Sequence, residues 1–235
     1  MHTFYKELTM KSVLFSFINW WTWLLTFTSG FANVVALLLF GTAVTHHTGN
    51  ISRLPLTFNH SAIHTHLFLL GLILSFFMGC VLSGVLFHDQ MLRPKKRYGI
   101  LLLSLGILLL LINLFSHSTL VLYTISFLSG AQNAMFLFVK TYLARTSHLT
   151  GYLTDTGFAL GRILAGYRSD WRKFLFNLSQ ICFFISGGYL GMIICTYLPK
   201  QAVNIIAYLY MTAGAIYFIV RSRHLFGFPG NSQHH

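Results

Sequence analysis

Acidic residues are the scarcest chemical group in this sequence. Its 235 residues include only four Asp and Glu against 16 Lys and Arg, and charged residues of both signs make up 9% of the chain. Because a soluble domain carries about 25% charged residues, this composition excludes an ordinary soluble protein. Four acids leave little for general acid–base catalysis, and the motifs of serine hydrolases, P-loop enzymes and zinc proteases are missing. We therefore expect a membrane protein that is not an enzyme.

Cysteine is also rare, and a cleavable leader is missing. Cys80, Cys182 and Cys195 all fall inside long apolar stretches, where thiols act as small packing residues more often than as disulfide partners or metal ligands. The first apolar stretch is too long for a signal peptide and has no small-residue cleavage site, so we expect it to be a membrane span behind a short lead. We expect no metal and no cofactor.

Long apolar stretches dominate the rest of the chain. A helix needs about 20 apolar residues to cross the hydrocarbon core of a bilayer. Six stretches approach that length, at residues 20–44, 66–87, 100–116, 120–139, 174–198 and 202–220. None carries Asp, Glu, Lys or Arg away from its ends, as expected where a charge in mid-membrane is costly. The sequence predicts an all-α integral membrane protein with six transmembrane helices.

Six spans divide the connecting segments between the two sides of the membrane, and the basic residues are distributed unevenly between these sides. A net charge of +12 could indicate nucleic-acid binding. With a cytoplasmic N-terminus, however, every Lys and Arg except Arg53 and Lys200 falls in a cytoplasmic segment. This positive-inside bias places both termini in the cytoplasm. We therefore expect contact with anionic lipid head groups and no nucleic-acid partner.

Two stretches about a hundred residues apart share an order of small and polar residues. The matches are Ser29-Gly30 with Ser129-Gly130, Asn33 with Asn133 and, after a two-residue insertion, Thr48-Gly49 with Thr150-Gly151. Their shared order indicates an internal duplication. Because each copy holds three spans, the second must enter the membrane upside down, in agreement with the charge distribution. The predicted fold is a 3+3 inverted-topology repeat. Its parts are a cytoplasmic lead (1–19), a first three-helix repeat (20–116), a second repeat (117–222) and a cytoplasmic tail (223–235).

Polar residues near the middle of the first and fourth spans are the predicted solute site. Asn and Gln in hydrocarbon need hydrogen-bonding partners, and Gly lets helix backbones approach closely. The expected substrate-binding residues are Gly30, Asn33, Gly130, Gln132 and Asn133. The same residues also fit a structural role, in which their contacts hold the two halves together.

The two Thr-Gly phrases are the predicted gates of that site. Each is expected to break its helix near the membrane surface, with Gly at positive φ and Thr or Asn capping a short interfacial or re-entrant helix that follows. The gate residues are Thr48, Gly49, Asn50, His148, Thr150, Gly151 and Asp155. His148 and Asp155 fit either a proton-relay pair or, more simply, a surface histidine and a helix cap.

Histidines crowd the first segment outside the membrane. They are His46, His47, His60, His64 and His66. The i, i+4 spacing of His60 and His64 suits two metal ligands on one helix face. No acid or Cys lies nearby to complete a zinc, copper or haem site, so solvated histidines at the level of the lipid head groups are favoured.

At these phrases the chain resembles the YoaK family, six-span bacterial membrane proteins grouped under a domain of unknown function. The family phrases Gly-x-x-Asp-Ala, Met-Thr-Gly-Asn, Gly-x-Gln-Asn-Ala and Thr-Gly-Thr correspond to residues 30–34, 47–50, 130–134 and 149–152. The resemblance covers residues 20–222 and implies the six-span fold, but brings no substrate. The family's acid in the first span is neutral Asn33 here, so coupling through that acid, if the family uses it, is not available to this chain.

The predicted function is a small-solute transporter or permease of the bacterial inner membrane. Its partners would be membrane lipid and a small-molecule or ion solute, and the lack of charge in mid-membrane favours a neutral or weakly charged one. The alternatives are an ion channel, or a non-transporting protein that binds metal, haem or lipid through its outer histidines. Small residues spaced by four at 79–83 and 187–191 predict close helix packing, within one chain or between copies in a homo-oligomer.

Overall fold

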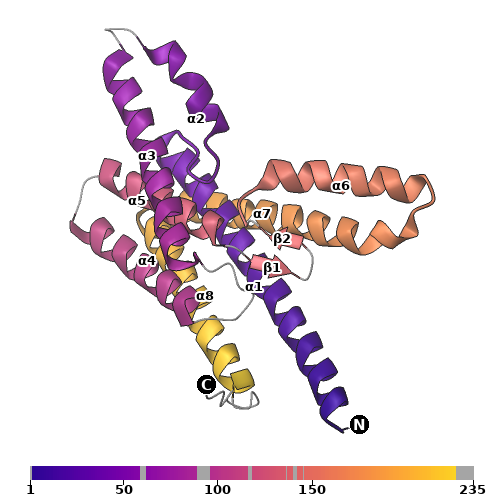
Figure 1. Cartoon of the computed structure of the whole chain (residues 1–235). Coiled ribbons are helices and arrows are strands. Elements are labelled where there is room, and N and C mark those ends of the chain that lie inside the picture. Colours follow the sequence, from indigo (N-terminus) through magenta and orange to yellow (C-terminus); the bar gives the residue numbers. More distant parts are fainter. Residues whose placement is uncertain are drawn as a thin grey trace.

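The computed structural model describes residues 2–58, 62–88, 96–115, 118–135, 137–139, 142–144 and 146–225, with side chains described for residues 19–58, 62–88, 96–115, 118–135 and 146–221. The described chain is almost entirely helical (Figure 1). The elements are α1 (His2–Phe40), α2 (Thr48–Arg53), η1 (Pro55–Thr57), α3 (Ile63–Leu86), α4 (Lys96–Phe115), α5 (Ser118–Ala134), β1 (Leu137–Val139), β2 (Tyr142–Ala144), α6 (Leu149–Leu164), η3 (Arg168–Asp170), α7 (Trp171–Tyr197), η4 (Pro199–Gln201) and α8 (Ala202–Leu225).

Five helical segments in the described residues are long and apolar enough to cross a membrane. They are Asn19–Phe40, Ile63–Leu86, Lys96–Phe115, Arg168–Tyr197 and Pro199–Arg221. Helix α5, which occupies the place of the predicted fourth span, has 17 residues and is not among them. The all-helical membrane character is therefore confirmed, with five candidate spans.

Two of the predicted spans end too late. The first was expected to reach residue 44, but α1 stops at Phe40 because Gly41, at φ 72°, turns the backbone out of the helix. The fourth was expected to reach residue 139, but α5 stops at Ala134. Residues 137–139 instead form β1, which pairs antiparallel with β2.

The face of α3 that points away from the other helices explains the membrane assignment. It exposes Leu67, Leu70, Leu74, Phe77, Met78, Val81 and Val85, which recur every three or four residues and so form one strip along the helix. In water such a strip would be an aggregation surface, whereas in a bilayer it contacts acyl chains.

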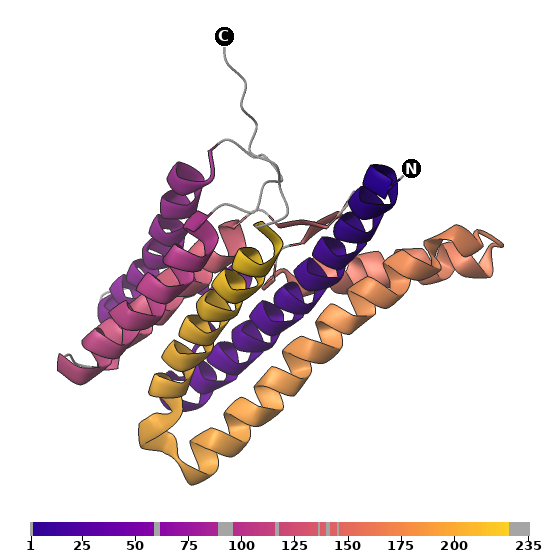
Figure 2. The ribbon, with the colours of Figure 1, turned by 90° about the horizontal axis from the view of Figure 1, so that it is seen from below.

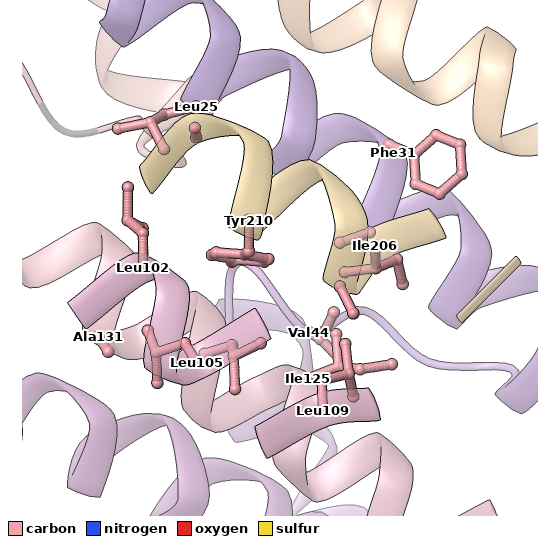
Figure 3. Close-up of a cluster of buried hydrophobic side chains, with 14 of the residues drawn as sticks. Leu25, Phe31, Val44, Leu102, Leu105, Leu109, Ile125, Ala131, Ile206 and Tyr210 are labelled. Carbon is pink, nitrogen blue, oxygen red and sulfur yellow. The ribbon is translucent and has the colours of Figure 1, made fainter. Parts of the chain in front are cut away.

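The long helices cross in pairs. Helix α1 packs against α7, α3 against α5, and α4 against α8. Figure 2 shows α1, α7 and α8 side by side. Buried apolar side chains fill the space where α1, α4, α5 and α8 meet, among them Leu25, Leu105, Ile125 and Tyr210 (Figure 3).

Glycine allows two of these crossings to be very close. A Cβ atom built on Gly30 would overlap the carbonyl oxygen of Phe184 in α7, and one built on Gly130 would overlap the carbonyl oxygen of Phe76 in α3. Any larger residue would force the helix backbones apart. In the described structure these two predicted substrate-site residues therefore serve as helix contacts.

The small residues spaced by four take part in the same crossings. Gly79 of α3 lies against the carbonyl of Phe127 in α5, and Gly187 of α7 lies against the carbonyl of Phe27 in α1. The predicted close packing is confirmed, and it occurs within one chain.

The Thr-Gly phrases begin helices and do not break them. Thr48-Gly49 is the first turn of α2, and Thr150-Gly151 lies in the first turn of α6. The described glycines with positive φ are Gly41 and Gly166, so the expectation of positive φ in the phrases is wrong. The chain leaves the helix earlier, after Phe40 and after Ala134, which leaves the phrases free to start the next helix.

The expected helix caps are also wrong. The residues at the N-cap positions of α2 and α6 are His47 and His148, and neither makes a side-chain capping bond. Asp155 lies in the second turn of α6, too far from its start to cap it. A helix nevertheless follows the second phrase, as predicted, and this helix is α6. It lies along the first part of α7 (Figure 1) and buries Tyr152, Thr156 and Ala159.

We predict that Gly130→Ala destabilises the protein by about 3 kcal/mol or more, because the added methyl group cannot be accommodated without moving a backbone. Gly84→Ala is the matched control, since a Cβ atom there meets nothing within 4 Å, and should leave stability unchanged or raise it by up to about 1 kcal/mol because alanine favours a helix. Thermal unfolding of both variants in detergent would test this. Equal midpoints would contradict the proposed crossing contact.

Candidate functional site

The stretch between α1 and α2 is non-helical but buried. Val44 and Thr45 are at most 1% exposed, and buried backbone N–H groups outside regular structure need partners. Oδ1 of Asn33, in α1, accepts hydrogen bonds from the N–H groups of Val44 (3.2 Å) and Thr45 (3.3 Å). The oxygen of this predicted substrate residue is therefore occupied by the chain itself.

Asn50, the last residue of the first predicted gate phrase, binds the same stretch from the other side. Its Nδ2 donates to the carbonyl of Ala43 (2.9 Å), and its Oδ1 accepts from the hydroxyl of Thr42 (3.1 Å). The side chain is 4% exposed. Asn33 and Asn50 together satisfy backbone and side-chain groups over residues 42–45, which holds the non-helical stretch against α1.

His47 extends this network to α5. Its Nδ1 lies 3.2 Å from Asn50 Nδ2, and its Nε2 lies 3.2 Å from Ser126 Oγ. The ring also packs against Phe76 of α3, with 4.6 Å between ring centroids. His47 is 8% exposed, so the expectation of a solvated histidine is wrong here, whereas His46 is exposed as expected.

The hydrogen bonds fix the protonation of His47. Asn50 must present its NH₂ group to the Ala43 carbonyl, so the neighbouring Nδ1 of His47 is an acceptor without a proton. Ser126 donates to the carbonyl of Leu72 (2.9 Å), so its oxygen accepts from Nε2–H of His47. The imidazole is therefore neutral. His47 lies on the connection between α1 and α2, outside the apolar helices. Burial there lowers the pKa of His47 to about 4, which agrees with a neutral ring.

Gln132 connects the two halves of the chain. From α5, its Nε2 lies within hydrogen-bonding distance of the Leu25 carbonyl (2.9 Å) and Ser29 Oγ (2.9 Å) in α1, and of Thr146 Oγ1 (2.7 Å) before α6. An NH₂ group has two hydrogens, so these three acceptors share them. The polar clusters of the first and fourth predicted spans thus meet at this amide.

Several polar side-chain atoms in α5 and in the residues before α6 are buried without a hydrogen-bond partner among the described residues. They include Oε1 of Gln132, Oδ1 of Asn133 and Oγ of Ser147. Each such atom costs about 1–3 kcal/mol unless water or a ligand satisfies it. Asn133 matches Asn33 in the duplicated sequence, yet Oδ1 of Asn33 accepts from two backbone N–H groups whereas Oδ1 of Asn133 has no partner among the described residues. Among the described residues, the Asn oxygen of the second half can therefore still accept hydrogen bonds, whereas that of the first half already accepts two.

The remaining predicted gate residues do not gather at this place. Thr48, Gly49 and Thr150 are exposed, and Gly151 lies beside the ring of His148 at the start of α6. The carboxylate of Asp155 is exposed and faces Lys173 of α7 at 3.9 Å, a surface ion pair that contributes little to stability. These residues lie at the starts of α2 and α6, and Asn50 alone is buried.

A stripe of polar residues runs along one face of α1, and its first three members were not predicted from the sequence. It consists of Asn19, Thr22, Thr26, Ser29 and Asn33, spaced by three or four residues on one helix face. Gln180 of α7 pairs with it, because its Oε1 accepts from Thr26 (2.6 Å) and its Nε2 donates to Thr22 (3.3 Å). The spacing alone could have shown that the polar cluster extends to the start of the first span.

The histidine metal site gains no support. The part of the chain with described side chains brings together no three His, Cys, Asp or Glu residues in a way that could hold a metal ion. Both ring nitrogens of His47 are engaged within the protein. His60, half of the proposed i, i+4 pair, lies outside the described residues.

Residues 21–217 match a family described as protein of unknown function (DUF1275). The chain belongs to this family. The match covers almost the same residues as the resemblance to the YoaK family and is consistent with it. No curated protein and no solved structure matches the chain. The function of this family member must therefore be inferred from its own residues.

We predict that Asn50→Ala lowers stability by about 3 kcal/mol, because Thr42, Ala43 and His47 each lose a buried partner. Thr48→Ala, in the same phrase but exposed, should change stability by less than about 0.5 kcal/mol. Chemical or thermal unfolding of the purified variants would measure both. Similar losses for the two variants would show that the phrase does not act through Asn50.

Proposed function

We propose that this chain is a small-solute transporter of the bacterial inner membrane, built as a 3+3 inverted repeat with both termini in the cytoplasm. Helices α1, α3 and α4 would form the first repeat, and α5, α7 and α8 the second. Helix α5 would serve as the sixth span. Its 17 residues measure about 25 Å along the axis, somewhat less than a full hydrocarbon core.

Matching helix contacts support the repeat. Gly30 meets the Phe184 carbonyl, and Gly130 meets the Phe76 carbonyl; Gly130 follows Gly30 by 100 positions and Phe184 follows Phe76 by 108. Exchanging the halves therefore turns one contact into the other. Such exchange is the property of two units related by a two-fold axis in the membrane plane.

The crossing of α4 and α8 has the same property. A Cβ atom on Gly106 would overlap the carbonyl of Ala207, and one on Gly214 would overlap the carbonyl of Gly99. Gly214 follows Gly106 by 108 positions, and Ala207 follows Gly99 by the same 108. A contact that maps onto itself in this way supports an axis that passes between these two helices.

The single observation that carries the transport proposal is the Gln132 amide. It is 1% exposed and joins α1, α5 and the non-helical residue Thr146. Helices that stop within the membrane and meet at the interface of inverted repeats are where transporters bind solute, and buried polar residues there are a general indication of function. The alternative that rests on outer histidines has less support, because His47 is used internally.

The inverted repeat predicts that equivalent positions face opposite sides of the membrane. Ser52 and Thr154 are both exposed, and each lies three residues after the glycine of its Thr-Gly phrase. In a background with the three cysteines replaced by alanine, Ser52→Cys should react with a membrane-impermeant maleimide in intact cells. Thr154→Cys should react only in inside-out vesicles. Reaction of both from one side would refute the repeat.

Transport itself predicts saturable uptake by the purified chain in proteoliposomes. The solute panel should include cations, anions and neutral molecules, with protein-free vesicles as the baseline. Gln132→Leu should abolish uptake because it removes every hydrogen bond that the amide makes across the two halves, whereas Ser186→Ala, an exposed site on α7, should retain it. Comparison of unfolding midpoints would exclude simple misfolding. If no solute on the panel shows saturable uptake, the transporter proposal fails.

A further inference from the structure

We infer that Oε1 of Gln132, Oδ1 of Asn133 and Oγ of Ser147 form a binding site for a small solute that donates N–H hydrogen bonds, such as ammonium, a primary amine or a small amide. This inference rests on the transporter proposed above and names the chemical class of its substrate. Gln132 and Asn133 are consecutive in α5, and the hydrogen bond from Gln132 to Thr146, the residue before Ser147, brings the two segments that carry these atoms together.

The orientation of the Gln132 amide determines which group it offers. Nε2 lies 2.9 Å from the carbonyl of Leu25, which can only accept a hydrogen bond. A flipped amide would bring two oxygens together, so the NH₂ group must face α1. The atom left over is the oxygen, which is buried and unpaired among the described residues. Gln132 therefore offers the site an acceptor.

The first half shows which donors suit the matching Asn oxygen. Asn33 Oδ1 accepts from two backbone N–H groups, those of Val44 and Thr45. With the two-residue insertion in the second half, the corresponding donors would come from Thr146 and Ser147. Asn133 Oδ1 instead has no partner among the described residues. A solute with N–H groups would supply the hydrogen bonds that the backbone supplies to Asn33.

The surrounding charge agrees with a solute of this class. No Asp, Glu, Lys or Arg occurs in α5 or in the described residues 19–40 of α1, so these two helices bring no full charge of either sign to the site. Two amide oxygens attract positively polarised N–H groups and repel an anion. The hydroxyl of Ser147 can accept a third hydrogen bond or donate one to a solute carbonyl.

Thermal unfolding of the full chain in detergent, titrated with separate solutes, would test this site. Ammonium chloride, methylammonium chloride and acetamide carry N–H groups. Tetramethylammonium chloride carries the charge without them, potassium chloride is an alkali control, and sodium acetate tests an anion. We expect a saturable rise in the unfolding midpoint with at least one N–H solute and no comparable rise with the other three.

Variants connect that response to the named atoms. Asn133→Leu should weaken the apparent affinity about tenfold and Ser147→Ala about threefold, the ranges for one lost hydrogen bond. Ser186→Ala, the same change at an exposed serine, should leave it unchanged. If Asn133→Leu does not fold, Ser147→Ala decides the matter. An equal response to tetramethylammonium and ammonium, a response to acetate alone, no response to any solute, or unchanged affinity in Asn133→Leu and Ser147→Ala would each overturn the inference.

The same solutes in proteoliposomes separate this inference from the proposed function. Binding that depends on Asn133 and Ser147 without any uptake would refute transport and leave the site standing. Saturable uptake that is insensitive to both substitutions would refute the site and leave transport standing.

Discussion

The structure depends on satisfying the backbone hydrogen bonds of a helix that stops among apolar residues. Thr42, Val44 and Thr45, which follow the end of α1, are buried, so water does not reach the freed N–H and C=O groups, and each one left unpaired costs about 1–3 kcal/mol. Asn33 and Asn50 meet this demand over residues 42–45, one from α1 and the other from α2. The break after Phe40 can persist because the following phrase brings Asn50 back to it. His47 then joins this arrangement to Ser126 of α5, so that the end of the first broken helix is held by the second half of the chain.

The glycine crossings are a second contact between the halves. With no side chain at Gly30 or Gly130, the paired helices approach until a backbone carbonyl occupies the place of the missing Cβ atom. These crossings join α1 to α7 and α5 to α3, whereas Gln132 joins α5 to α1 at Leu25. The small residues and the buried amide thus hold different pairs of helices together, and structural and functional interpretations of this cluster do not exclude each other.

Much of the fold could be predicted from the sequence, because apolar stretches, small-residue spacing and basic loops act locally. The helix ends could not. Residues 42–44 and 136–139 are mostly small or apolar, so hydropathy continues past the point where Gly41 and Ala134 end their helices. The burial of His47 was also unpredictable, since its environment includes Ser126, 79 positions away. Gln132 and Asn133 stood out as polar residues in an apolar span. That Gln132 Oε1 and Asn133 Oδ1 have no hydrogen-bond partner among the described residues follows only from the three-dimensional structure.

In the proposed transporter, the difference between the halves indicates where a conformational change would occur. The crossings made by glycine and backbone are matched in the two halves, and they could not loosen without separating whole helices. The Asn hydrogen bonds are not matched, since Asn33 is bonded to the stretch after α1 whereas Asn133 Oδ1 has no partner in the described part of the chain. Side-chain hydrogen bonds of this kind net only about 1 kcal/mol each, so they can exchange while the crossings stay intact. Alternating access would then require one Asn side chain to bind the stretch that follows its helix while the other Asn side chain releases its own. The motion would be confined to the residues that follow α1 and α5.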